Sequence, residues 1–407
     1  MRTQRINFRH FSIVLVVLFS INIFQIQLIS REFIRFLNFI TVLSVFFLSI
    51  RYSFVFRKGF FLPIQLIIFS MIFSFFSAHY LWGQSFFDTL KGIIPYMIWI
   101  YFFFLVKMKI PIEKIEKIVV IFGVVYLVLY LFQLINYRTI FFGWVSEYGF
   151  ERGFVRINFP GTGLFLLSVF IALNKISLDV NIKGWIFWAI IGLLVIILQV
   201  TRQNIIGIFA IYLIHFLRQK KLSTRILIPS FFGLVIVILF LFDLDIFSRI
   251  GFENQQAFKQ GENYIRILSG TYFLTEFAQN DFARIFGSGL PYGGKSNYFN
   301  LIYQLYQKSF ALEDLGLIAI YSMFGIIAVL GYVLIFIKSF TIKLPDRYYY
   351  LKYYLWFLII TSLTSYNIYH YNYLIATVFV LYIYQTVFDN EKIILKTSES
   401  KNNYDKP

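Results

Sequence analysis

The residues best suited to chemistry in this sequence are arginines placed between apolar segments. Arg202 lies in VTRQNIIG, a turn that joins two apolar runs and leaves almost no room for a loop. An arginine at membrane depth costs several kcal/mol unless it faces a wet cavity or a partner. Guanidinium groups bind phosphate oxygens through a rigid two-pronged fork. Arg202 is therefore a candidate for binding a phosphorylated ligand.

Side chains able to accept a proton accompany this arginine. His370 lies in SYNIYHYNY, where an unperturbed pKa would suit proton acceptance; the alternative is a histidine in a Tyr-rich membrane interface. Glu262 is the second catalytic candidate. Further acidic residues expected on the same side are Asp243, Asp245, Glu147, Glu151, Asp281, Glu313 and Asp314. With no cysteine, no Walker-type glycine loop and no His-rich motif, the sequence gives no signal for a thiol nucleophile, ATP or a metal.

Composition places these residues in a membrane protein. The 407-residue chain is 59% hydrophobic and 22% aromatic, with only 14% charged residues. We expect an all-α, polytopic fold with about twelve transmembrane helices, because apolar runs near the bilayer-crossing length recur throughout. The expected spans are 11–29, 34–50, 60–79, 92–106, 118–135, 160–174, 185–201, 204–217, 226–242, 316–337, 353–367 and 372–388. The first run lacks a small-residue cleavage site, so we interpret it as a retained span and not as a signal peptide.

Charge predicts the orientation of these spans. With the N-terminus inside, 24 of the 37 basic residues but only 8 of the 20 acidic residues fall on the inner side. This distribution follows the positive-inside rule, so the formal charge of +17 is a topology signal and not a nucleic-acid footprint. Both termini are therefore expected in the cytoplasm.

Arginine and lysine divide unequally between the two sides. The outer side has nine arginines and four lysines, whereas the inner side has eight and sixteen. The positive-inside rule does not distinguish the two residues, so the outer arginines indicate a phosphorylated ligand; the alternative is contact with lipid headgroups. Arg31, near the first outer turn, is expected to tolerate lysine.

The chain divides into four parts on this reading. Residues 1–242 form spans one to nine, 243–315 one long outward loop, 316–388 the last three spans and 389–407 a cytoplasmic tail. The loop is expected to contain two short amphipathic helices. The first covers 263–285 and ends at Gly287, which suits a C-terminal cap. The second covers 296–312, with one apolar face lying on the membrane; that face comprises Tyr298, Leu301, Ile302, Leu305 and Leu312.

Three segments together resemble the family of bacterial O-antigen polymerases and O-antigen ligases. The turn VTRQNIIGIFAIYLI is similar to the family's turn of an apolar residue, Ser or Thr, Arg and an apolar residue. In NYIRILSGTYFLTEFAQNDFARIFGSGL, Arg266 stands early in a helix, and Gly287 and Gly289 follow in a Gly-x-Gly turn, as in the family's large outer loop. In KSNYFN, Asn297 matches the family's His-Asn pair, whereas Ser296 stands where the histidine would be.

The resemblance covers roughly residues 136–340 and includes an earlier outer loop, EYGFERGFVRINFPGTG. There Arg152 and Gly163 are eleven positions apart, similar to the Arg and Gly of polymerase outer loops. The resemblance implies a diphosphate-binding set of Arg202 and Arg266, together with Arg156 and Arg152.

A member of this family is a glycosyltransferase of the bacterial cytoplasmic (inner) membrane. It takes glycan from a polyprenyl diphosphate at the outer face and transfers it to a sugar hydroxyl, without a metal or a cofactor. The acceptor is another lipid-linked repeat unit for a polymerase, or a sugar of the lipid A core for a ligase. The Arg–Gly spacing favours the polymerase. The implied partners are polyprenyl-diphosphate-linked oligosaccharide and membrane lipids, with a chain-length regulator and a flippase as candidates.

Two other classes of protein remain open at this point. A lipid-linked oligosaccharide flippase or another transporter would also fit twelve spans, but such carriers usually show related halves and broken polar helices. No internal repeat is visible, and the polar residues concentrate on one side. A structural membrane protein without activity would leave the arginine bias unexplained.

Overall fold

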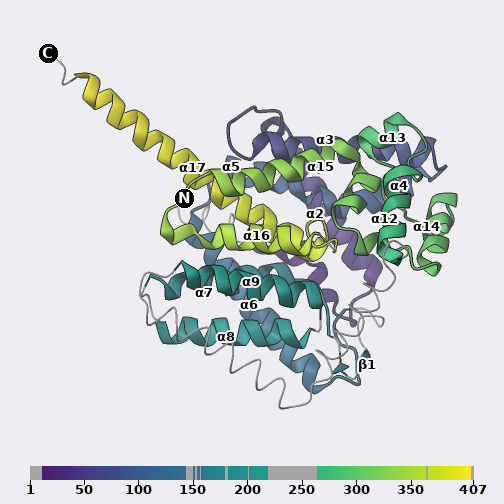
Figure 1. Cartoon of the computed structure of the whole chain (residues 1–407), viewed down its shortest axis with the longest axis horizontal. Helices are drawn as coiled ribbons and strands as arrows, with labels where there is room; N and C mark the ends of the chain where they lie inside the picture. Colours follow the sequence, from purple (N-terminus) through teal and green to yellow (C-terminus); the bar gives the residue numbers. More distant parts are fainter. Residues whose placement is uncertain are drawn as a thin grey trace.

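The computed structural model describes residues 12–143, 150–151, 154–155, 157–178, 182–199, 201–218, 264–363 and 365–404. Within these residues the protein is built almost entirely of helices packed in a bundle (Figure 1). The end of the last helix extends beyond the bundle on one side. The expected all-α class is confirmed, with one two-residue strand pair in which Phe150 lies opposite Val155.

The elements follow the chain from the N-terminal part to the C-terminus. After a helix at 12–20 and the turn η1 (Asn22–Gln25) come α2 (Arg31–Ser53), α3 (Phe61–Tyr80), α4 (Phe86–Ile93), η2 (Ile94–Ile100), α5 (Tyr101–Met108) and α6 (Ile112–Ile135). Next are β1 (Phe150–Glu151), β2 (Phe154–Val155), α7 (Thr162–Ile176), α8 (Ile182–Leu198) and α9 (Arg202–Leu217). The C-terminal part has α12 (Ile265–Thr275), α13 (Asp281–Phe286), α14 (Asn297–Gln307), η5 (Leu312–Asp314), α15 (Leu317–Thr341), η6 (Asp346–Tyr348), α16 (Tyr350–Thr361) and α17 (Tyr371–Tyr404).

Six of the described helices are long and apolar enough to cross a membrane. They cover Arg31–Ser53, Phe61–Tyr80, Phe86–Met108, Ile112–Ile135, Leu317–Thr341 and Tyr371–Asn390. Three shorter apolar helices cover Thr162–Ile176, Lys183–Leu198 and Arg202–Leu217. The protein is therefore of the helical membrane type. The predicted span 226–242 lies outside the described residues, and the four-part division of the chain stays a prediction.

The short helix α7 lies at the centre of the bundle. Its first thirteen residues, Thr162 to Asn174, are all buried, and it packs against α6, α8, α16 and α17. A helix that is apolar on every side is expected in such a position, because it has no face that gains from water.

The connections between helices gather at two ends of the bundle. At one end, Arg347 pairs with Glu113 at 3.0 Å, and Arg218 pairs with Asp346. The other end holds η1, the segment 365–373 and the helices α12, α13 and α14, which lie together on the right in Figure 1. We call this second end the loop end. Among the described residues, it contains Arg31, Arg35, Arg202 and Arg266, which the charge pattern assigns to the outer side.

The first predicted span, 11–29, is wrong in its second half. The helix ends at residue 20, and Asn22 to Gln25 form a left-handed turn with φ between 50° and 54°. The cause is a distant pairing of backbones: the N–H of Gln27 donates to the carbonyl of Phe141 at 2.9 Å, and that of Gly143 to Gln25 at 3.0 Å. The segment INIFQIQ contains neither glycine nor proline, so the sequence gives no signal for this turn.

Smaller corrections concern the ends of other helices. α7 begins at Thr162 after Gly161 (φ 110°), so Pro160 precedes the helix and does not lie in its first turn. α16 ends at Thr361, before the end of the predicted span 353–367.

The predicted helix 263–285 is two helices, α12 and α13. The chain leaves the helical path after Thr275, and Asn280 starts α13 by accepting a hydrogen bond from the N–H of Ala283 at 2.9 Å. Gly287 caps α13 as expected, with φ 84°. The second predicted helix, 296–312, is present in its first part as α14, which ends at Gln307, and Leu312 lies in η5. The apolar face of α14 packs on the protein, because the Tyr298 ring stacks on Trp82 at 4.9 Å.

The glycine turn after α13 is inserted into a break in α15. Gly325 interrupts α15 with φ 74° and ψ −179°, which leaves carbonyl groups free to accept from another segment. The N–H groups of Ser288 and Gly289 donate to Ser322 and Met323 at 2.9 and 2.8 Å. This contact fixes the long loop against the bundle.

Candidate functional site

The segment 365–373 is the centre of the loop end, because three other parts of the chain bind it: the start of α9, η5 and η1. On one side, the amide of Asn367 donates to Asn204 at 2.8 Å, and that of Asn204 donates to the Tyr373 hydroxyl at 3.2 Å. Asn204 lies in the first turn of α9, next to Arg202. These bonds attach the start of α9 to the start of α17.

The turn that carries Arg202 is held from its other side as well. Gln199, at the end of α8, is buried and donates to the Tyr126 hydroxyl at 2.9 Å. That hydroxyl lies 3.1 Å from the Thr162 hydroxyl at the start of α7. Arg202 is half-buried as the first residue of α9. The neighbouring hydrogen bonds therefore fix the backbone of Arg202 at the loop end, in agreement with the tight turn expected from the sequence.

A second part of the site comes from the long loop. The guanidinium of Arg266, at the start of α12, pairs with the Asp314 carboxylate at 3.2 Å, and about a third of its side chain is exposed. The neighbouring residue Glu313 accepts a hydrogen bond through its carbonyl from the N–H of Tyr366 at 3.0 Å. Arg266 is thus joined to segment 365–373 through the short turn η5.

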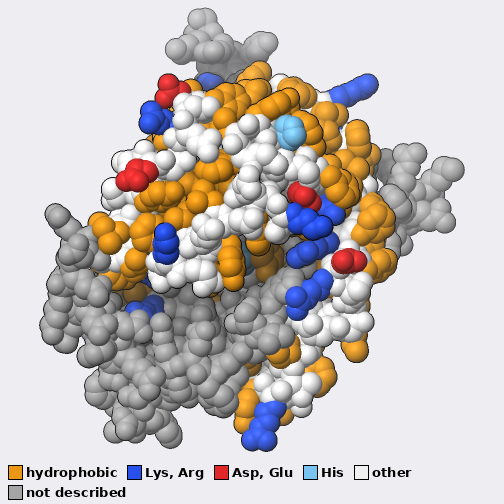
Figure 2. All heavy atoms as spheres, turned by 90° about the vertical axis from the view of Figure 1, so that its right-hand side faces the viewer, with side chains coloured by type: hydrophobic (Ala, Val, Ile, Leu, Met, Phe, Trp, Pro, Cys, Tyr) orange, Lys and Arg blue, Asp and Glu red, His pale blue; other side chains and the backbone are white. Residues whose placement is uncertain are grey.

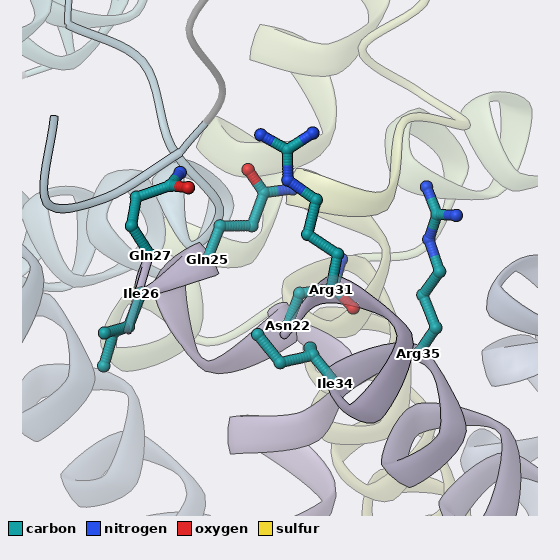
Figure 3. A pocket seen from close by; sticks show the side chains of 7 residues that line it. All are labelled: Asn22, Gln25, Ile26, Gln27, Arg31, Ile34 and Arg35. Carbon is teal, nitrogen blue, oxygen red and sulfur yellow. The ribbon is translucent and has the colours of Figure 1, made fainter. Parts of the chain in front are cut away.

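A third part is a pocket beside η1, lined by two arginines and three amides (Figure 3). Gln25 donates to the Tyr371 hydroxyl at 3.2 Å, which attaches the pocket to the start of α17. Arg35 donates to the Tyr292 hydroxyl at 3.3 Å, which attaches it to the glycine-rich part of the long loop. Arg31 lines this pocket, and the expectation that it tolerates lysine stays a prediction.

His370 lies in the middle of segment 365–373 but does not have the ordinary pKa expected of it. Its ring is 4.4 Å from Tyr366 and 4.2 Å from Tyr371, centroid to centroid. Desolvation in this aromatic surrounding lowers the pKa of the half-buried His370 to about 3. The imidazole is therefore neutral at pH 7, free to hydrogen-bond but a weaker base than the sequence indicated.

The lowered pKa of His370 predicts a pH dependence of stability. The unfolded histidine binds a proton below about pH 6.5 and the folded one does not, so stability is lost as pH falls from there towards 3. Between about pH 7 and about pH 4 the melting temperature of the wild type should fall further than that of His370→Gln. If the melting temperatures of the two proteins fall by the same amount over this pH range, His370 keeps its ordinary pKa in the folded protein.

The remaining predicted site residues divide into three groups. Gly287 and Gly289 are buried, with their backbone directed to α15 and α3, so they hold the loop and do not face a ligand. Asn297 is exposed at the first position of α14. Arg152, Arg156 and Glu262 lie outside the described residues.

Ser296, which stands where the family's histidine would be, has a structural role. Its hydroxyl accepts a hydrogen bond from the N–H of Phe299 at 3.0 Å and so caps α14. The buried Gln84 lies nearby, donating to the Leu290 carbonyl at 2.9 Å and accepting from the Tyr292 N–H at 2.8 Å. Gln84 thereby fixes the loop from the turn between α3 and α4.

Sequence reasoning missed Gln25, Asn204, Asn367 and the two arginines of the pocket. The spacing of Arg31 and Arg35, one helical turn apart, was a usable signal for a shared face. The amides carried no such signal, because their partners lie more than 160 positions away in the chain.

Figure 2 shows the loop end from outside, with Lys and Arg side chains gathered near the middle of the face beside a recess. Acidic side chains lie among them, and apolar side chains surround the group. The sequence matches no family model and no curated protein. The resemblance drawn from the sequence therefore depends on the residues quoted for it.

Proposed function

We propose that the protein is a polymerase of lipid-linked oligosaccharide repeat units. It transfers glycan from a polyprenyl diphosphate to the sugar hydroxyl of another repeat unit at the outer face of the bacterial cytoplasmic membrane. The observation that carries the proposal is that two neighbours of these arginines bind one segment, 365–373, at one end of the bundle. Asn204, two residues after Arg202, bonds to Asn367, and Glu313, next to the Asp314 that pairs with Arg266, bonds to Tyr366. Arginines fixed on a rigid helical frame suit a diphosphate leaving group.

The chemistry proposed is a single displacement at the first carbon of the donor sugar. The acceptor hydroxyl oxygen bonds to that carbon, the bond from the carbon to the diphosphate oxygen breaks, and the hydroxyl proton leaves to a base. Arg202 and Arg266, with Arg156 and Arg152, bind the departing diphosphate and stabilise its growing negative charge. His370 and Glu262 are the two candidates for the base; the low pKa of His370 makes it a weak one.

The proposal requires that the loop end faces outward. The predicted arrangement of twelve spans with both termini in the cytoplasm would give this orientation, and reporter fusions test it. Fusions after Lys221, Lys343 and Lys392 should report the cytoplasm, and fusions near Gly149 and Gly261 should report the outside. A cytoplasmic signal from Gly261 would contradict the proposal, because the loop could not then meet a lipid-linked substrate that has been moved across the membrane.

The length of the surface glycan tests the reaction itself. Cells that lack the gene should show single repeat units in place of a ladder of chain lengths, and the intact gene should restore the ladder. A ligase would give a different result, because its loss leaves long chains that are not attached to lipid A core. A transporter would leave the repeat units inside the cell.

A further inference from the structure

The pocket beside η1 contains chemistry that the proposed function does not use. Its lining consists of Asn22, Gln25, Ile26, Gln27, Arg31, Ile34 and Arg35, with no acidic side chain among these seven. Figure 3 shows the guanidinium groups of Arg31 and Arg35 extending to the same side from α2, with the Gln25 amide close to Arg31. The cavity volume is about 30 Å³, which is room for about two waters. The cavity therefore fits one small polar group, and a larger ligand would extend out through its open side.

Three features make this pocket attractive for an anion. Arg31 and Arg35 are four positions apart on α2, so their side chains start about 5–6 Å from each other on one face. The pocket lies at the N-terminal end of α2, where the helix dipole favours negative charge. Both arginines are exposed on this side, so a ligand reaches them from outside the bundle.

Gln25 adds an observation that does not depend on charge. Its side chain is only 7% exposed, and its Oε1 oxygen is buried with no hydrogen-bond partner among the described residues, although its Nε2 donates to Tyr371. A buried acceptor without a donor is rare and is usually explained by a missing ligand or water. A hydroxyl next to the anionic group would supply the donor.

The backbone that carries Gln25 is held in an unfavourable conformation. Asn22, Ile23, Phe24 and Gln25 all have φ near 50°, and no glycine relieves the strain. Left-handed residues of this kind cluster at ligand-binding sites, where the surrounding structure imposes the strain. Here the backbone bonds of Gln27 and Gly143 impose it.

We propose that this pocket binds the phosphate of a membrane lipid whose headgroup carries hydroxyl groups. Arg31 and Arg35 hold the phosphate, and the Gln25 Oε1 accepts from a neighbouring hydroxyl. Within the proposed function, on which this assignment of the source depends, the ligand is the glycosyl diphosphate of a second lipid-linked unit, the acceptor. Polymerisation needs two such lipids at once, so a second phosphate site fits a polymerase.

Hydrogen exchange of the purified full-length protein, measured over residues 19–36, covers the backbone of all seven residues that line this pocket. The probes are a polyprenyl-diphosphate-linked oligosaccharide, phosphatidylglycerol and inorganic pyrophosphate. Lipid should slow exchange in this segment, and Arg31→Gln with Arg35→Gln should raise the half-maximal lipid concentration at least about tenfold. Arg51→Gln, at the other end of the same helix, is the matched control and should change nothing.

The outcomes distinguish the possible sources of the phosphate. They also distinguish a failure of this proposal from a failure of the proposed function. Protection by the oligosaccharide lipid at lower concentration than by phosphatidylglycerol supports the acceptor assignment. Equal protection by both lipids overturns that assignment and identifies a general lipid site. If lipid protects the wild type and the double variant equally, the proposal that this pocket binds the phosphate is overturned. This result can be obtained even when the protein shows no polymerase activity.

Discussion

Alanine at Gly287 or Gly325 is expected to prevent stable folding. Gly287 has φ 84° and ψ 171°, and Gly325 has φ 74° and ψ −179°, conformations that only glycine adopts readily. An added Cβ would lie 2.2 Å from the Met323 carbonyl oxygen at Gly287, and 2.2 Å from that of Ile285 at Gly325. Both obstacles are backbone atoms, so no side-chain rotation removes the clash. We expect each change to cost at least about 3 kcal/mol of stability.

The measurement is the melting temperature of the purified protein in detergent, together with the yield of monodisperse material. Gly294→Ala is the control, because Gly294 also has a positive φ (63°) but no atom within 4 Å of its added Cβ. That change should cost only about 1 kcal/mol. If Gly287→Ala melts at the same temperature as Gly294→Ala, the insertion of the loop into α15 is not as described.

Lysine at Arg202 or Arg266 is expected to abolish most chain growth without loss of folding. Lysine keeps the positive charge but loses the two-pronged contact with a diphosphate. Hydrogen bonds to charged groups are worth about 1.5–3 kcal/mol, so each change should slow transfer about tenfold or more. The ladder of glycan chain lengths, at matched protein level, should shorten in both variants.

Two controls distinguish diphosphate binding from a structural role for these arginines. Arg284→Lys should be silent, because Arg284 is half-exposed and pairs with Asp281 on its own helix, α13. Asp314→Asn removes the partner of Arg266 at 3.2 Å. If Arg266 serves only this ion pair, Asp314→Asn shortens the ladder as much as Arg266→Lys does; if it binds the diphosphate, the ladder stays long. Full ladders from both Arg202→Lys and Arg266→Lys would leave these arginines as contacts to lipid headgroups.

Local features of the fold could be predicted from the sequence because they depend on local signals. The apolar runs gave the helices, and the Gly-x-Gly turn gave the cap at Gly287. Arg202 was placed correctly in a tight turn, since no other arrangement connects α8 and α9.

The features of the fold that could not be predicted depend on contacts between residues far apart in the sequence. The left-handed turn at Asn22–Gln25 depends on backbone contacts with residues 141–143, and the break at Gly325 on the glycine turn of a distant loop. The apolar pattern of each segment alone favours an unbroken helix. The lowered pKa of His370 likewise follows from neighbours that only the folded chain brings together. The pocket beside η1 was missed for this reason, although Arg31 and Arg35 were visible in the sequence.

The central claim is tested most directly by the reaction in a purified system. The full-length protein in liposomes is given a polyprenyl-diphosphate-linked repeat unit as its only glycan, with no nucleotide sugar. We predict glycans of two or more repeat units, with one polyprenyl diphosphate released for each new glycosidic bond. If the repeat units stay single, the assignment as a polymerase is contradicted. This result counts when the protein melts as a folded species and the lipid is accessible on the side of the loop end.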